Sequence, residues 1–150
     1  MGEVSVRPAT PVDLDALVGL LKDLFALEPD FRFDPVRQRR GLALLLEDRL
    51  RRVALVAESG GVVVGMVTGQ LLVSTAECGG SVLVEDLVVR ESERRRGTGR
   101  KLVRAVEAWA RGRGATRLQL LADRENEAAL RFYERLGWSG TRMVCLRRAT

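Results

Sequence analysis

VLVEDLVVRESERRRGTGRKLVR, residues 82–104, is the stretch that decides the fold of this chain. An apolar run leads into three consecutive arginines, and a Gly-Thr-Gly turn then opens a segment whose apolar spacing predicts a helix from about Thr98. The first N–H groups of a helix have no partner within it and lie at the positive end of its dipole. Because Gly97 and Gly99 carry no Cβ, a ligand can come close to this backbone. The turn therefore predicts a phosphate-binding site.

Positive charge is concentrated beside this turn. Residues 90–104 contain seven basic side chains and two acidic ones, which gives a net charge of +5. The basic residues are Arg90, Arg94, Arg95, Arg96, Arg100, Lys101 and Arg104. The whole chain also has a net charge of +5, so its other residues are balanced. An evenly basic surface of the kind that binds nucleic acid is therefore not expected.

Three phosphate-binding patterns can be compared with the turn. The Walker A pattern G-x-x-x-x-G-K-[ST] is absent, because the chain contains no Gly-Lys-Ser or Gly-Lys-Thr. The dinucleotide pattern G-x-G-x-x-G would need a glycine where Leu102 stands. What remains is Arg-x-x-Gly-x-Gly at Arg94, Gly97 and Gly99. This motif resembles the acetyl-CoA pyrophosphate loop of the GNAT superfamily of N-acetyltransferases.

The composition predicts one globular domain over residues 1–150, because 46% of the residues are hydrophobic and no linker is visible. No apolar run reaches the ~18 residues of a membrane span and no signal-like stretch opens the chain, so a cytoplasmic protein without a membrane partner is expected. Histidine is absent, which excludes Ser-His and Cys-His catalysis and most catalytic zinc sites, and no metal is expected. Cys78 and Cys145 are expected to be buried or half-buried thiols, with a disulfide the less favoured interpretation.

The chain pattern predicts an α/β (α+β) fold with the element order β-α-α-β-β-β-α-β-α-β. Strands are expected at 3–8, 53–58, 62–75, 82–89, 116–122 and 141–147, and helices at 10–27, 34–50, 98–112 and 126–136. The three middle strands form an antiparallel meander, and the next helix and strand complete one βαβ unit. This order matches a GNAT-like mixed central sheet and extends the resemblance over nearly the whole chain.

Two features of these elements have alternative explanations. Gly65 and Gly69 interrupt the strand at 62–75, where bulges are favoured over the close approach of a ligand. The loop LEPDFRFD, residues 27–34, carries three acids and two aromatic residues. It either borders a substrate pocket or only connects two helices.

A second motif extends from Asn126 to Trp138. Its residues NEAALRFYERLGW resemble the Asn-x-x-Ala-x-x-Phe-Tyr-x-x-x-Gly-Phe/Trp segment of the same family. The helical spacing of Phe132 assigns it to the core. The resemblance implies that Tyr133 lies near the sulfur of CoA as the acid for the departing thiolate, and it groups Asn126 with the cofactor-binding residues.

The same resemblance implies how acetyl-CoA is bound as a co-substrate. Backbone groups of Leu87, Val88 and Val89 would pair with its pantetheine arm, and one of their N–H groups would polarise the thioester carbonyl. The pyrophosphate would be held by Arg94, Arg95, Arg96, Gly97, Thr98, Gly99 and Arg100. Only some of the three consecutive arginines are expected to touch it, because side chains in a turn point in different directions.

The expected acceptor is an amine, whose proton must be removed. An alkyl ammonium has a pKa near 10 and an unperturbed glutamate one of about 4.3, a gap of ~8 kcal/mol. The pKa of the amine must be lowered, that of the carboxylate must be raised by burial, or water must relay the proton. Glu85 is the first candidate for the base or for positioning water, and Asp86 is the second. Strand alternation puts Glu85 and Asp86 on opposite faces unless a bulge intervenes, so only one is expected to face the cleft.

At one position the sequence differs from the histone-type members of the family that it resembles. Their general base would fall on Leu83, which cannot accept a proton. The sequence Glu-Asp-Leu-Val-Val, residues 85–89, is more similar to that of small-molecule acetyltransferases such as glucosamine-6-phosphate N-acetyltransferase. The resemblance therefore implies acetyl transfer from acetyl-CoA to a primary amine of a small molecule, by direct attack in a ternary complex.

Other functions stay open at this point. The chain could be a CoA-binding module without catalysis, or it could acetylate a protein N-terminus or a lysine. Nucleic-acid binding is disfavoured, because only 5% of the residues are aromatic and could stack on bases. The sequence decides neither the identity of the amine nor whether the protein is a homodimer.

Overall fold

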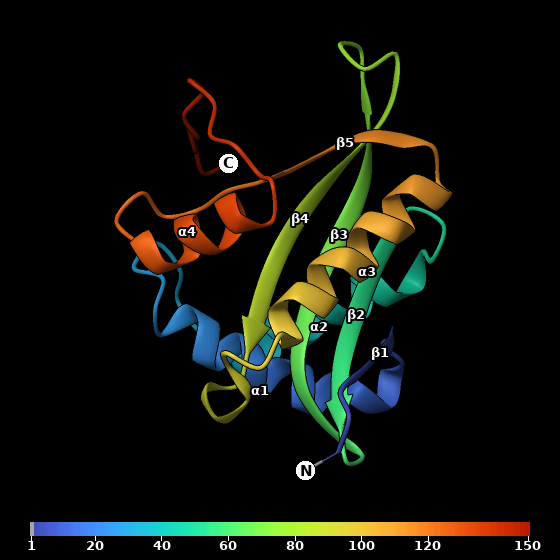
Figure 1. Cartoon of the computed structure of the whole chain (residues 1–150), viewed down its shortest axis with the longest axis vertical. Helices are drawn as coiled ribbons and strands as arrows, with labels where there is room; N and C mark the ends of the chain where they lie inside the picture. The colour runs from blue at the N-terminus through green and yellow to red at the C-terminus, as the bar shows by residue number, and fades with distance from the viewer. Residues whose placement is uncertain (1) are drawn as a thin grey trace. The chain divides into compact units, whose positions relative to one another are not determined.

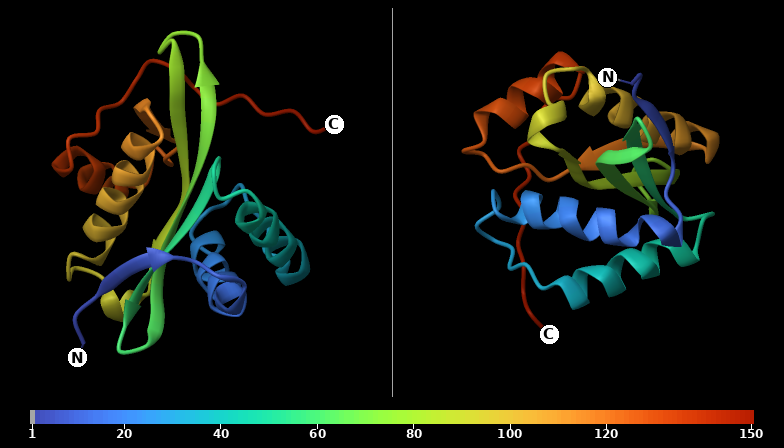
Figure 2. Two further views of the ribbon diagram at one scale, coloured as in Figure 1. Left: turned by 90° about the vertical axis from the view of Figure 1, so that its right-hand side faces the viewer. Right: turned by 90° about the horizontal axis from the view of Figure 1, so that it is seen from below.

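The computed structural model describes residues 2–150. Contacts divide the chain into two compact units, one that ends at Leu120 and one that covers Leu121–Thr150. The first unit is a five-stranded sheet with helices on both faces, as Figure 1 shows. Helix α3 (Thr98–Gly112) covers one face, and α1 (Leu14–Phe25) and α2 (Pro35–Glu47) cover the other (Figure 2).

The sheet has the mixed topology that the sequence predicted. Its strands, in their spatial order, are β1 (Ser5–Pro8), β2 (Arg52–Ser59), β3 (Val62–Ser74), β4 (Gly79–Val89) and β5 (Ala115–Leu120). Neighbouring strands from β1 to β4 are antiparallel, whereas β4 and β5 are parallel and are joined through α3. The predicted meander and the predicted βαβ unit are therefore both confirmed.

The helices begin where local sequence signals predict. Asp34 accepts hydrogen bonds from the backbone N–H groups of Val36 and Arg37 at 3.0 and 3.2 Å, and Pro35 occupies the first position of α2. A 3₁₀ turn (Pro11–Asp13) precedes α1, and a second one (Glu91–Glu93) precedes α3. Within residues 2–150, no helix is both long and apolar enough to cross a membrane.

The core of the first unit has a layer on each face of the sheet. On the side of α1 and α2, the fully buried side chains include Leu17, Leu20, Leu42, Val56 and Met66. On the side of α3, they include Leu102, Val103 and Val106. The apolar side chains of each helix thus pack on the sheet, which is the main source of stability for such a fold.

Gly65 and Gly69 allow α3 to lie close to β3. A Cβ atom at Gly65 would lie 3.1 Å from Leu102, and one at Gly69 would lie 3.1 Å from Val106. The β2–β3 register also shifts beside Gly65, so the predicted bulge is confirmed there. Gly69 lies in a regular part of that pairing, opposite Val53, so close helix packing explains this glycine.

The second unit contains α4 (Glu127–Arg135). The side chain of Asn126 accepts a hydrogen bond from the N–H of Ala129 at 3.1 Å, which caps the helix as expected. After the helix, Gly137 has a φ of 88°, the left-handed conformation that ends helices and favours glycine.

Two predictions about the end of the chain and the cysteines are wrong. The segment expected as a strand, 141–147, has no regular structure among the described residues, and its Met143 and Leu146 are each 89% exposed. A strand is stable only with a paired neighbour, and the second unit itself contains none. Cys78 and Cys145 are both exposed free thiols, because one lies in the β3–β4 turn and the other in this irregular segment.

Candidate functional site

A β-bulge interrupts β4 at Asp86. Thr68 of β3 pairs with Glu85 and Met66 pairs with Val88, so one residue of β3 lies opposite two residues of β4. Asp86 has a φ of 51°, which is unusual for a residue other than glycine. The extra residue reverses the alternation of side chains along the rest of the strand. The face that each carboxylate occupies therefore depends on this bulge.

The bulge brings the two candidate bases to one face of the sheet. Glu85 lies opposite Thr68, and directly opposed residues of antiparallel strands project to the same face. The hydroxyl of Thr68 donates a hydrogen bond to Oδ2 of Asp86 at 3.1 Å. Both acids therefore project to the side of Thr68, which is the side of α1 and α2. We expected only one of the two acids to face the site, because side chains alternate along a regular strand. The bulge breaks this alternation, so the expectation is wrong.

The environment of Asp86 makes its carboxylate a stronger base. Burial, followed by the negative charges of Glu85 and Glu28, raises the pKa of Asp86 to about 6, while the hydrogen bond from Thr68 acts in the opposite direction. Glu28 belongs to the 27–34 loop, whose Phe31 stacks on Phe25 at a ring separation of 5.2 Å. This electrostatic link favours the interpretation that the loop borders a substrate site.

The start of α3 has the features of an anion site. Gly97 has a φ of 81° and precedes the first helical residue, and no side chain among residues 2–150 caps this helix. Thr98 is 1% exposed, and its hydroxyl oxygen has no hydrogen-bond partner within the described chain. A Cβ at Gly97 would meet no atom within 4 Å, so the space beside the turn is open. Uncapped N–H groups at an open helix start fit a phosphate group.

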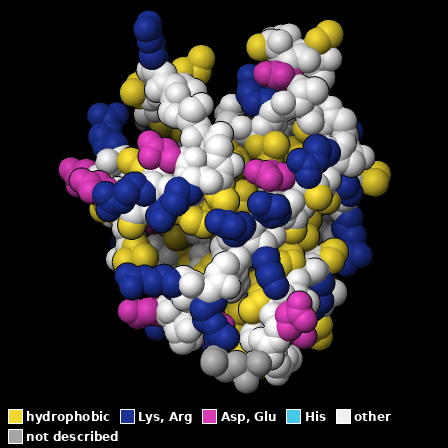
Figure 3. Space-filling view, viewed as in Figure 1, with side chains coloured by type: hydrophobic (Ala, Val, Ile, Leu, Met, Phe, Trp, Pro, Cys, Tyr) yellow, Lys and Arg dark blue, Asp and Glu magenta, His cyan; other side chains and the backbone are white. Residues whose placement is uncertain are grey.

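The arginines of this loop differ in what they contact. Arg94 donates through Nε to the carbonyl of Val89 at 3.0 Å, and Arg96 forms an ion pair of 2.8 Å with Glu93. Arg95 and Arg100 make no hydrogen bond or ion pair with any residue that the structure describes. Basic side chains also spread over the face on which α3 lies (Figure 3). Two guanidinium groups of the loop are therefore available for an anion.

One edge of β4 is unpaired beside this loop. β5 pairs only with Gly80–Val84 of β4, so within the first unit Val88 and Val89 pair with β3 alone and Leu87 lies in the bulge. The carbonyl of Val89 accepts from Arg94 and so points to this edge. An extended ligand could hydrogen-bond to the edge as an added strand would.

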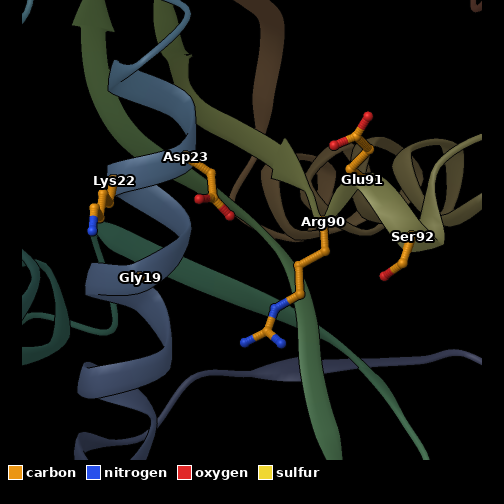
Figure 4. Close-up of a pocket in the computed structure, with 6 residues that line it drawn as sticks. All are labelled: Gly19, Lys22, Asp23, Arg90, Glu91 and Ser92. Carbon is orange, nitrogen blue, oxygen red and sulfur yellow. The ribbon is translucent and has the colours of Figure 1, made fainter.

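A groove lies between α1 and the segment after β4. It is lined by Gly19, Lys22, Asp23, Arg90, Glu91 and Ser92. Figure 4 shows the side chains of Asp23 and Arg90 extending towards the space between them, whereas Lys22 lies on the other side of α1. The groove is thus lined by two acidic and two basic side chains, and its Arg90 and Glu91 directly follow β4.

Two of the predicted residues belong to the second unit. Tyr133 lies in α4, half-buried, and its ring packs on Phe132 and Trp138 at centroid separations of 5.2 and 5.8 Å. Phe132 was predicted to be a core residue, but it is only half-buried and α4 has no buried residue, so this prediction is not confirmed. Asn126 uses its side-chain oxygen to cap α4.

Sequence reasoning missed Thr68 and Glu28. Thr68 is 2% exposed and is one of the few polar residues in an apolar strand, and that was the signal in the sequence. Its partner could not be predicted, because the register of β3 with β4 includes the bulge. Glu28 gave no separate signal within its acidic loop.

Comparison with known proteins identifies the family. The acetyltransferase (GNAT) family matches residues 20–138 of the chain. The aminoglycoside N(6')-acetyltransferase type 1 of Salmonella typhimurium is 25% identical over 144 residues, which cover 94% of this chain and 95% of that protein. The uncharacterized N-acetyltransferase YobR of Bacillus subtilis is 36% identical over 56 residues, 37% of this chain and only 23% of that protein.

Solved structures share the fold. A transcriptional regulator from Bacillus halodurans C-125 has a TM-score of 0.87 and 27% identity, over 98% of this chain and 100% of that one. The aminoglycoside N-acetyltransferase AAC(6')-Iy in complex with CoA has a TM-score of 0.85 and 21% identity, over 99% and 96% of the two chains. The family match includes both motifs singled out in the sequence, from Arg94 and from Asn126. The chain therefore belongs to the acetyltransferase (GNAT) family, and the prediction of an N-acetyltransferase is confirmed.

Proposed function

We propose that the protein transfers the acetyl group of acetyl-CoA to a primary amine of a small molecule, by direct attack in a ternary complex. The observation that carries this proposal is the arrangement along β4. A partly buried carboxylate, an unpaired strand edge and an uncapped helix start follow one another from Asp86 to Thr98. Acetyl-CoA supplies an activated thioester when it is bound, and the residues of the chain position it and handle protons.

Binding of acetyl-CoA would use the edge of β4 and the loop after it. Backbone groups of Leu87, Val88 and Val89 would pair with the pantetheine arm, and an N–H group there would donate to the thioester oxygen. The N–H groups from Gly97 to Arg100 would hold the pyrophosphate, with Arg95 and Arg100 as its free guanidinium partners. Arg94 and Arg96 would instead hold the loop in shape, through the carbonyl of Val89 and the carboxylate of Glu93.

Proton removal from the amine would fall to the carboxylates on β4. Glu85 and Asp86 share one face, so either can reach an acceptor bound over that face. Asp86 has the raised pKa that a base needs in order to act near neutral pH. Tyr133 of α4 would donate its phenolic proton to the departing thiolate, as the second motif implies. Asn126, from the same motif, would belong to the cofactor-binding residues.

The acceptor that suits this face carries several positive charges. The negative charges of Glu28 and Glu85 act on Asp86, and no lysine or arginine pairs with Asp86 among residues 2–150. An ammonium group next to the reacting one would neutralise this charge and would be attracted to it. The relatives named above include proteins described as aminoglycoside acetyltransferases. We therefore propose a small polycationic amine, such as an aminoglycoside or a polyamine, as the acceptor class.

A panel of acceptors tests the proposal. The full chain would be incubated with acetyl-CoA and with kanamycin, spermidine, glucosamine 6-phosphate or a lysine peptide, and thiol release would be measured. We expect kcat/KM at least about tenfold higher for the polycations than for the other two, and an advantage that shrinks as salt rises. Preference for the lysine peptide would support protein acetylation instead. Tight acetyl-CoA binding without thiol release for any amine would support a non-catalytic CoA-binding module.

A further inference from the structure

We infer that Thr68 is the positioning residue of the site and that its hydrogen bond, together with the bulge, makes Asp86 rather than Glu85 the carboxylate that accepts the proton of the amine. This inference rests on the proposed acetyl transfer to an amine. It adds a residue outside both family motifs, on the strand next to β4.

The hydrogen bond between Thr68 and Asp86 has a fixed direction, from the hydroxyl to the carboxylate. Thr68 is 2% exposed in an apolar part of β3, and its hydroxyl donates to Oδ2 of Asp86 at 3.1 Å. An ionised carboxylate can only accept, so the hydroxyl must be the donor. Threonine is β-branched and holds its χ1 angle firmly. The donor is therefore fixed by the sheet, and it fixes the carboxylate of Asp86 in turn.

The backbone of Asp86 has an unusual conformation. Its left-handed φ of 51° is unfavourable for a residue with a Cβ, and such conformations persist where the surrounding structure imposes them. Here the bulge between β3 and β4 imposes it. In a regular strand, Asp86 would project to the face of α3, away from Thr68. The bulge is therefore what allows this hydrogen bond to form.

The second carboxylate oxygen of Asp86 would receive the proton of the amine. Oδ2 of Asp86 is engaged by Thr68, so Oδ1 is left to accept a proton from the ammonium group of the substrate. The N–H bond breaks with its electron pair left on nitrogen, which becomes the neutral nucleophile, and the carboxylate becomes a carboxylic acid. The pKa of Asp86 is about 6, so the gap to an alkyl ammonium near 10 is about four, against about six for an unshifted glutamate.

The groups around Asp86 act on its pKa in opposite directions. Glu85 on the same strand and Glu28 from the loop after α1 raise its pKa, and the Thr68 hydroxyl lowers it. Removing Thr68 and removing Glu85 should therefore shift the pKa of Asp86 in opposite directions. A positioning role of Thr68 predicts in addition that kcat falls in Thr68→Val although the pKa of Asp86 rises, because a purely electrostatic role would make the carboxylate a stronger base.

The test compares pH profiles of kcat/KM for four variants of the full chain with the best amine of the panel. The wild type should lose activity at low pH with an apparent pKa near 6. Thr68→Val should move this acid limb to higher pH and lower kcat about tenfold, and Thr68→Ser, which keeps the hydroxyl, should restore both. Glu85→Gln should move the limb to lower pH. Asp86→Asn should lower kcat/KM about 10²-fold or more at every pH.

Measurements without turnover separate the possible failures. Melting temperature and acetyl-CoA affinity must stay near wild type in Thr68→Val, so that a folding defect is recognised. ¹³C NMR of the aspartate carboxyls, with Asp86→Asn for assignment, should show the titration of Asp86 moved upward in Thr68→Val. An unmoved titration and an unmoved acid limb, or an active Asp86→Asn, would overturn the inference. If no amine supports thiol release but the titration moves, the proposed function fails while the Thr68–Asp86 coupling stands.

Discussion

Val82 and Val88 of β4 lie on opposite faces of the sheet, although they are six positions apart, a spacing that puts two residues of a regular strand on the same face. Val82 lies under α3, near Gly69 and Val106, whereas Val88 belongs to the cluster beneath α1 and α2. The extra residue at Asp86 causes the reversal. A strand that changes face in this way can supply apolar side chains to both core layers and still hold two carboxylates together.

The bulge predicts an unusual order of stabilities at position 86. Asp86→Gly and Asp86→Ala both remove the carboxylate, but only alanine keeps a Cβ in the left-handed region. The glycine variant should therefore be more stable than the alanine variant by about 1 kcal/mol. Urea unfolding of the two variants measures the difference. A more stable alanine variant would show that the chain relaxes to a regular strand.

The free arginines predict where the affinity for acetyl-CoA comes from. Arg95→Ala and Arg100→Ala should each weaken binding about tenfold at low salt, because each removes a charge-assisted contact to the pyrophosphate. Arg111→Ala, which removes an equal charge from the last turn of α3, serves as the control. Titration calorimetry at two salt concentrations measures the effect. Equal losses in all three variants would mean that only the overall charge matters.

The buried hydroxyl of Thr98 predicts a stabilising substitution. It has no partner among residues 2–150, so Thr98→Val, of nearly equal shape, should raise the free energy of unfolding by about 1 kcal/mol. Acetyl-CoA affinity should change less than twofold, because Thr98 would bind through its N–H group. Calorimetric titration and thermal melts check both numbers. A tenfold loss of affinity would assign the hydroxyl itself to the phosphate.

An ion-pair network predicts how stability changes in acid. Asp13 is buried and accepts two hydrogen bonds from Arg7 at 2.9 and 3.0 Å, and Arg7 also contacts Glu58. The Arg7 hydrogen bonds, helped by Thr10, outweigh burial and lower the pKa of Asp13 from 3.8 to about 2. Its contribution to stability is therefore complete above pH 4 and is lost as the pH falls from about 4 to about 2.

The corresponding variant is Asp13→Asn. It should lower the free energy of unfolding by about 2 kcal/mol at pH 7, and the difference from wild type should shrink between pH 4 and pH 2. Asp23→Asn, at an exposed position, is the matched control. Denaturant unfolding across this pH range gives the comparison. A difference that stays constant with pH would assign the loss to packing.

Tyr133 predicts a loss of turnover without a loss of stability. Tyr133→Phe removes the hydroxyl and keeps the ring that packs on Phe132 and Trp138. If Tyr133 is the acid for the thiolate, kcat should fall about 10²- to 10⁴-fold while acetyl-CoA affinity changes little. Melting temperature and kcat are measured together. A wild-type kcat removes Tyr133 from the mechanism, and a large fall in melting temperature would indicate a packing role.

Local signals in the sequence determined most of the elements and their order. Helix starts at Asp34 and Thr98, the helix cap at Asn126 and the left-handed Gly137 follow from groups within a few residues of one another. The motif at Arg94, Gly97 and Gly99 identified the family for the same reason. Its chemistry is a property of one turn, so no distant contact is needed to recognise it.

Tertiary structure alone decided which side chains meet. The bulge at Asp86 depends on how β3 pairs with β4, and alternation within one strand cannot reveal it. The hydrogen bond from Thr68 and the charge of Glu28 reach Asp86 from residues that lie 18 and 58 positions away in the chain. The expected strand at 141–147 was wrong because a pattern of apolar residues supplies no neighbour to pair with. The sequence thus specified the groups available for catalysis, whereas the pairing of β3 with β4 set the orientation of Asp86 and burial in the folded chain raised its pKa.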